Sequence, residues 1–152
     1  MEARLVEVTA ERDVELLRRL IEKYHLQGVP RGAGAGRGTR FFAYAVREEG
    51  GGEYWVAGAW LHDCTPFRLI AEKLGIPCDN SYFIRRVCKF APGDWLVQFL
   101  AALAERLREE GKECLWTLGL PGHSNALYKL AGFQEVGRTA RSGHPVYVLW
   151  LR

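Results

Sequence analysis

One amphipathic helix, expected between Asp94 and Gly111, constrains the fold of this chain more than any other feature. Its apolar positions recur every three or four residues and so form a single stripe. Pro92-Gly93 before the helix and Gly111 after it are the usual start and stop signals. The stripe must be buried against a sheet or another helix. It consists of Trp95, Leu96, Phe99, Leu100, Leu103 and Leu107.

Short aromatic and β-branched runs predict strands around this helix. The runs 41–47 and 54–61 are joined by a Gly-rich segment, which favours an antiparallel hairpin. This order of elements predicts an α/β (α+β) fold, a mixed sheet covered by helices, in a single domain over 1–152. Other strands are expected at 4–8, 81–90, 114–118, 134–138 and 146–151, and other helices at 11–24, 67–74 and 124–130.

The composition is that of a soluble globular protein. Hydrophobic residues make up 48% and charged residues 26% of the chain, and no apolar run approaches the roughly 20 residues of a membrane helix. The first residues, Met1-Glu2-Ala3-Arg4, do not begin a secretory signal, so a cytoplasmic location without a membrane partner is expected. A net charge of +3 is too small to indicate a dedicated nucleic-acid binder.

The four cysteines are scattered and form no CxxC pair. In a chain that looks neither small nor secreted, this pattern predicts buried thiols. His62-Asp63-Cys64 with Cys78 fits no metal motif by spacing, so no metal site is expected.

A Gly-rich segment, 32–38, lies between the first helix and the hairpin. It fails the GxGxxG spacing, lacks the Lys of a P-loop and leads into a strand, so it is interpreted as a flexible loop. Arg31, Arg37 and Arg40 are the charges in and beside this loop. They suggest a functional version of this loop that folds over an acidic substrate or a phosphate.

The C-terminal third contains Leu127-Tyr128-Lys129-Leu130-Ala131-Gly132-Phe133. Together with the preceding strand, long helix and strand, it resembles the GCN5-related N-acetyltransferase (GNAT) superfamily and its terminal LYxKxGF pattern. The order of elements fits over nearly the whole chain. The resemblance implies a mostly antiparallel sheet whose two central parallel strands, 81–90 and 114–118, splay apart to admit an acyl thioester.

The resemblance also implies an acyltransferase site. Acetyl-coenzyme A, or another acyl-coenzyme A, would be the co-substrate, and a primary amine of a small molecule or protein would attack it directly. Tyr128 would protonate the departing thiolate, as a phenol with a pKa near 10 is able to do. His123 is the candidate general base. Backbone groups of Val87, Cys88, Lys89 and Phe90 would bind the pantetheine arm.

The loop before the long helix departs from the family pattern. The family places small residues there, so that backbone N–H groups approach the coenzyme pyrophosphate. Here the sequence reads Pro92-Gly93-Asp94-Trp95-Leu96-Val97, and only Gly93 matches. Asp94 is expected to cap the helix, where its carboxylate would repel a phosphate. Gly93, Asp94, Trp95 and Leu96 are nevertheless the positions that correspond to the coenzyme loop.

Alternatives to catalysis remain. Leu127, Tyr128 and Phe133 would form an apolar face in any case, and Ser124 or Asn125 suits a helix cap. A non-catalytic binding domain would have the cleft between the splayed strands filled by Trp95 or other side chains.

Two further alternatives concern partners. Arg85-Arg86, Gly122-His123 and Tyr128 also resemble the Mom-like nucleic-acid modification proteins of the same superfamily. In that case nucleic acid would be the partner, which the charge does not favour. A homodimer through the aromatic strand 146–150 is another candidate assembly.

Overall fold

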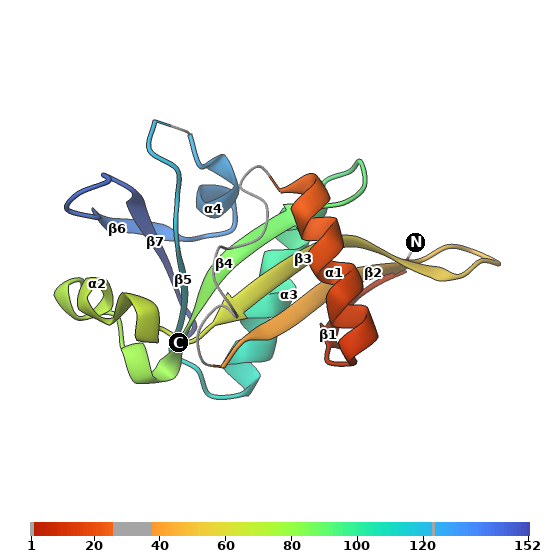
Figure 1. Cartoon of the computed structure of the whole chain (residues 1–152), viewed down its shortest axis with the longest axis horizontal. Coiled ribbons are helices and arrows are strands. Elements are labelled where there is room, and N and C mark those ends of the chain that lie inside the picture. The colour runs from red at the N-terminus through yellow and green to blue at the C-terminus, as the bar shows by residue number, and fades with distance from the viewer. Residues whose placement is uncertain (1, 26–37, 123) are drawn as a thin grey trace.

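The computed structural model describes residues 2–25, 38–122 and 124–152. They form one seven-stranded sheet in the order β1-β2-β3-β4-β5-β7-β6, with helices on both faces (Figure 1). All neighbouring strands are antiparallel except β4 and β5, which confirms the predicted mixed sheet. The strands are β1 (Glu2–Val8), β2 (Arg40–Arg47), β3 (Glu53–His62), β4 (Ser81–Lys89), β5 (Cys114–Leu118), β6 (Gln134–Arg138) and β7 (Pro145–Trp150). The helices are α1 (Glu11–Tyr24), α2 (Arg68–Lys73), α3 (Trp95–Glu109) and α4 (Ala126–Leu130), with 3-10 turns at Thr65–Phe67 and Cys78–Asn80.

Helix α3 covers one face of the sheet, behind the strands in Figure 1. Its predicted apolar stripe is the side that packs on the sheet, because Phe99, Leu100, Leu103 and Leu107 are fully buried. Burial of each such side chain stabilises the fold by roughly 1.5–3 kcal/mol. Within the described residues, no helix is long and apolar enough to cross a membrane.

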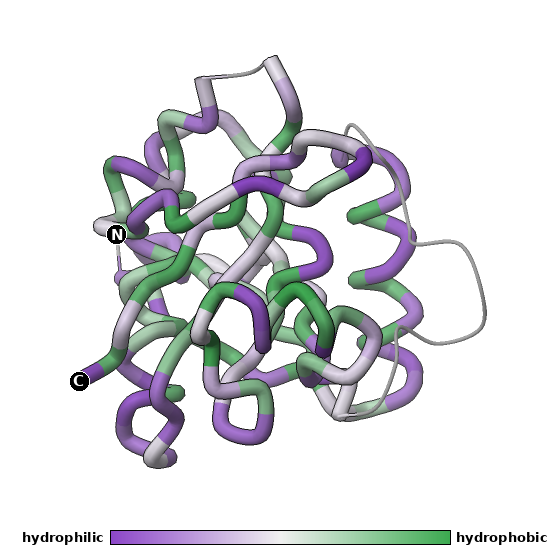
Figure 2. The backbone as a smooth tube through the Cα atoms, turned by 90° about the vertical axis from the view of Figure 1, so that its left-hand side faces the viewer, coloured by the Kyte–Doolittle hydropathy of each residue, from purple (hydrophilic) through white to green (hydrophobic). Residues whose placement is uncertain are grey.

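Helix α1 covers the opposite face, in front of the strands in Figure 1. In Figure 2 its sheet-facing side is apolar and its outer side hydrophilic. Its residues Leu17 and Ile21 are fully buried against the sheet. The helix packs close because β3 has a glycine there: a Cβ on Gly58 would lie 2.6 Å from both the Leu17 and the Phe90 side chains.

The cysteine prediction is wrong for one pair. Cys64 and Cys78 form a disulfide, with their Cα atoms 5.2 Å apart. The segment between them folds back through α2, which brings two distant positions within the usual range for a disulfide. Cys88 and Cys114 are buried free thiols as expected, and burial raises the pKa of each to about 12.

Strand β7 is not an edge strand, contrary to the expectation for 146–150. It pairs with β5 on one side and with β6 on the other, so its backbone groups are already used. Strand β6 forms an antiparallel hairpin with β7 and so covers the edge of β7 that does not face β5. The dimer hypothesis therefore loses its proposed pairing strand.

Candidate active site

The central parallel strands separate, as predicted. Strands β4 and β5 pair only where residues 81–83 face residues 114–116. Beyond that point β4 stays paired with β3 and β5 stays paired with β7, and Figure 1 shows β4 and β5 diverging. The hydroxyl of Thr117 donates a hydrogen bond to the carbonyl oxygen of Ile84 at 2.8 Å, which closes the base of the gap.

A β-bulge in β4 accompanies the separation. Trp60 pairs with Arg86 and the next residue, Leu61, pairs with Ile84, so Arg85 is an extra residue in β4. A bulge bends its strand and re-aims the side chain of the extra residue. The bend thus occurs where β4 leaves β5, and it places Arg85 at the gap.

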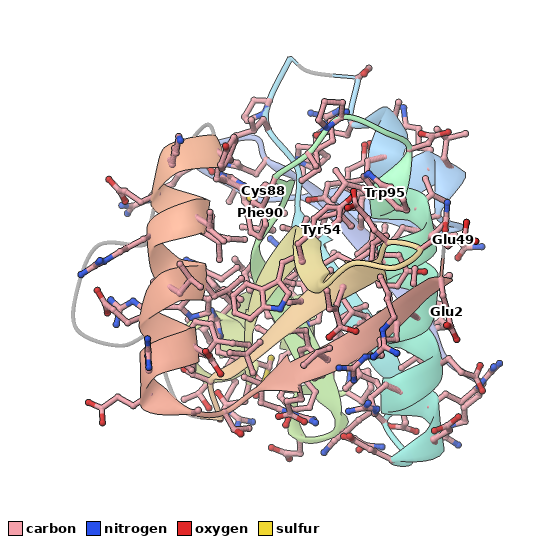
Figure 3. The ribbon with its side chains drawn as sticks, turned by 90° about the vertical axis from the view of Figure 1, so that its right-hand side faces the viewer. Glu2, Glu49, Tyr54, Cys88, Phe90 and Trp95 are labelled. Atoms are coloured by element: carbon pink, nitrogen blue, oxygen red, sulfur yellow. A yellow bond between two sulfur atoms is a disulfide. The ribbon has the colours of Figure 1, made fainter. Side chains whose placement is uncertain are left out.

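The edge of β4 beyond the bulge has backbone groups that face the gap. Phe90 donates its N–H to Val56 of β3 at 2.7 Å. Because hydrogen bonding alternates along an antiparallel strand, the N–H groups of Val87 and Lys89 point to the opposite edge. The side chains of Cys88 and Phe90 pack towards α1 instead (Figure 3), so these two residues could serve a ligand in the gap only through their backbone.

Two adjoining cavities open at the gap, with volumes of about 230 and 100 Å³. The larger extends to Phe67, Phe83 and His144, and the smaller extends to Thr117, Tyr128 and His25. Trp95 lines neither of them. Within the part of the chain that the structure describes, the gap therefore holds cavities, which the acyltransferase interpretation predicts and the filled-cleft alternative does not. Both cavities share Ile84, Arg85, Arg86, Leu118, Gly119 and Leu120.

Tyr128 projects from α4 into the smaller cavity. Its ring stacks on Tyr147, with 5.4 Å between centroids, and meets Phe133 edge-on at 5.6 Å. Burial raises the pKa of Tyr128, and the nearby Thr117 hydroxyl opposes this increase. The phenol is therefore protonated at neutral pH and able to donate its proton.

Asn125 positions α4 by a contact that the sequence interpretation missed. Asn125 occupies the N-cap position of the helix, as one of the two predicted candidates, but its side chain forms no capping hydrogen bond. The side chain instead accepts a hydrogen bond from Leu120 N–H at 3.1 Å and donates one to Leu120 C=O at 3.2 Å. Its backbone is left-handed, with φ of 52°. Gly119 makes room for this turn, since a Cβ there would lie 2.8 Å from Asn125 and from the Tyr147 ring. The two contacts fix the entry to α4.

The loop before α3 is shaped by Trp95, at the top of the helix in Figure 3. The indole N–H of Trp95 donates to Pro92 C=O at 3.0 Å. A Cβ on residue 93 would lie 2.5 Å from that nitrogen, so the position of the indole ring requires glycine there. Asp94 occupies the N-cap position as predicted, but its side chain forms no capping hydrogen bond. Lys89 donates to Gly93 C=O at 3.3 Å, and Leu96 packs on the core.

Positive charge gathers at the gap. Arg85 and Arg86 are partly buried, and burial lowers the pKa of both; the charge of Arg85 lowers that of Arg86 further. The Arg85 guanidinium lies 5.4 Å from the centre of the Phe67 ring. Burial, followed by the charge of Arg86, lowers the pKa of His25 to about 4, so this imidazole is neutral at pH 7.

Of the three arginines expected to bind substrate, only Arg40 lies within the described residues, and it lines neither cavity of the gap. Arg31 and Arg37 lie outside the described residues, as does His123. Arg40 donates four hydrogen bonds to the carboxylates of Glu7 and Glu110, at 2.7–3.0 Å. Its guanidinium ties β1 and β2 to the end of α3, which is a structural role.

Sequence reasoning missed four residues around the gap: His25, Phe67, Thr117 and Asn125. Only Thr117 left a signal, as a polar residue near the end of an otherwise apolar strand. The others reach the gap from separate segments. Among the described residues, no group of three or more His, Cys, Asp or Glu side chains could hold a metal ion.

The chain is similar in sequence to one viral protein. It is 59% identical over 138 residues to Uncharacterized protein 154 of Sulfolobus islandicus rod-shaped virus 1, which covers 91% of this chain and 89% of that protein. The sequence matches no protein-family profile.

Several solved structures with the same fold are named as acetyltransferases. The aminoglycoside acetyltransferase AAC(6')-Ib, in complex with coenzyme A, superposes with a TM-score of 0.65 and 15% identity, over 98% of this chain and 95% of that one. The spermidine/spermine N-acetyltransferase SpeG of Vibrio cholerae superposes with a TM-score of 0.63 and 10% identity, over 99% and 95%. At such low identity these similarities show the fold alone.

Proposed function

Because this chain belongs to the same family as protein 154 of Sulfolobus islandicus rod-shaped virus 1 and has the GNAT fold, we propose that it is an acyl-coenzyme-A-dependent N-acyltransferase. The acceptor is a primary amine. One observation supports this most: among the described residues, cavities lie between β4 and β5, and a protonated tyrosine lines one of them. A fold retained only for binding would not need that combination.

The gap fits the acyl end of the co-substrate. The N–H groups of Val87 and Lys89 face it without a strand partner, and a thioester carbonyl polarised by such donors is more open to attack. The amine nitrogen forms a bond to the carbonyl carbon, and the carbon–sulfur bond breaks. Tyr128 then supplies the proton that the departing thiolate needs. His123 remains our candidate to accept the proton of the amine.

The pyrophosphate end fits less well. The Asp94 carboxylate lies at the start of α3, although it forms no hydrogen bond with the first N–H groups of the helix. Trp95 fills the loop that small residues form in the family. We therefore expect affinity for the coenzyme to depend mainly on the gap.

Calorimetric titration with acetyl-coenzyme A tests the binding step. We expect a one-to-one complex, and no binding up to about 1 mM, or about −4 kcal/mol, would refute the proposal.

The catalytic step is tested by Tyr128→Phe. Removing the proton donor should lower kcat by about 100-fold, measured as release of the coenzyme thiol, while coenzyme affinity stays nearly unchanged. Tyr54→Phe, which makes the same chemical change at an exposed tyrosine of β3, is the matched control. Equal rates for the two variants would show that Tyr128 is not the acid.

A further inference from the structure

The larger cavity has an unusual charge for a site that receives an amine. Its lining includes Arg85, Arg86 and His144, and no aspartate or glutamate is among the described residues that form it. A polycationic acceptor would meet like charge there, which is unfavourable at short range.

Arg85 differs from Arg40, which is also partly buried. Arg40 is matched by the carboxylates of Glu7 and Glu110, which compensate its charge. Within the described ranges Arg85 forms no salt bridge, and it contacts the ring of Phe67 instead. Burial without a counter-charge disfavours a guanidinium, so an anion at this position would be stabilised.

The neighbouring Arg86 adds to the same field. Its guanidinium donates to the carbonyl oxygen of Arg85 at 2.8 Å, which orients it along β4. It lines both cavities with Arg85, next to the place where we put the thioester. Two adjacent guanidinium groups suit the oxygen atoms of a carboxylate or a phosphate.

The rest of the lining sets the size of the acceptor. Phe67, Phe83, Leu118 and Leu120 form apolar walls around about 230 Å³, which is smaller than a typical drug-sized site. The space suits a short carbon spacer that joins an anionic group to an amine. Phe67 belongs to the segment closed by the disulfide, so this wall is anchored at both ends.

We infer that the acceptor carries an anionic group, a carboxylate or a phosphate, close to its primary amine, and that Arg85 and Arg86 bind this group in the larger cavity. The inference rests on the proposed acyltransferase function. It places the amine at the gap and its anionic group on the Phe67 side.

Three primary amines with the same two-carbon spacer, together with spermidine, test the inference. β-Alanine carries a carboxylate, O-phosphoethanolamine a phosphate, 2-aminoethanol no charge besides its amine, and spermidine several cations. With acetyl-coenzyme A present, kcat/KM is measured for each by thiol release and by mass spectrometry of the product. We expect one or both anionic amines to exceed 2-aminoethanol by at least about tenfold, as hydrogen bonds to charged groups would give. The better of the two identifies the carboxylate or the phosphate.

Variants identify the residues. Arg85→Gln and Arg86→Gln should each reduce the preference for the anionic amine over 2-aminoethanol by about tenfold. Arg19→Gln, which removes an exposed arginine of α1, changes the net charge equally and should leave the preference unchanged. A preference for spermidine or 2-aminoethanol, or a preference that Arg85→Gln does not alter, would overturn the inference.

A direct binding measurement separates the two proposals. Calorimetric titration of the four amines without coenzyme reports on the arginine site even if acetyl-coenzyme A fails to bind. Failure of acetyl-coenzyme A alone would refute the acyltransferase proposal. Coenzyme binding without selective binding or turnover of an anionic amine would refute only the inference about the acceptor.

Discussion

Reduction of the disulfide between Cys64 and Cys78 should destabilise the whole protein. The bond joins residues separated by 14 positions. Closing a loop of about 15 residues removes chain entropy from the unfolded state worth about 3 kcal/mol at 25 °C. For a chain of this size, about 2–4 °C per kcal/mol corresponds to a Tm lower by about 6–12 °C. The linked segment carries Phe67, so the larger cavity should lose order as well.

Thermal unfolding followed by circular dichroism, with and without a phosphine reductant, measures this effect. The double variant Cys64→Ala/Cys78→Ala is the control, because the same reductant should leave its Tm unchanged. Comparing each protein with itself avoids the packing loss that the substitution of buried Cys64 brings. Titration of thiols in the denatured, unreduced protein should find only Cys88 and Cys114. Four thiols, or a reductant effect below about 3 °C, would contradict the reasoning.

Two further predictions concern stability. Arg40→Gln leaves the carboxylates of Glu7 and Glu110 without their shared cation and should lower the free energy of unfolding, measured in urea, by about 2 kcal/mol. Arg4→Gln removes a cation from a solvent-exposed pair with Glu53 and should lower it much less. Similar losses for the two variants would argue against the network. Burial lowers the pKa of His25 to about 4 in the folded protein. Between about pH 6.5 and pH 4 the unfolded chain therefore binds more protons at this residue, and the free energy of unfolding decreases as the pH is lowered. His25→Gln should make that fall shallower in urea titrations, and an unchanged slope would exclude this contribution.

The elements of the fold were predictable from local patterns. The stripe of α3, the Gly-rich hairpin turn and the short apolar strands each depend on periodicity within about ten residues. Their bounds agree with the prediction to within a few residues, and the family resemblance added the separation of β4 from β5. The position of β7 was not predictable, because pairing with β6 depends on the path of the chain and not on the strand itself.

For the site, the sequence alone determined that Tyr128 lies just after the candidate helix caps Ser124 and Asn125, and that Arg85 and Arg86 lie on β4. It did not determine their surroundings. The tertiary structure decided that Cys64 meets Cys78 and that Asn125 holds Leu120. It also decided that Arg85 lines a cavity to which the described residues contribute no carboxylate. The reason is physical: periodicity reports which face a residue takes within its own element, whereas charge compensation and disulfide formation depend on distances between elements far apart in the chain.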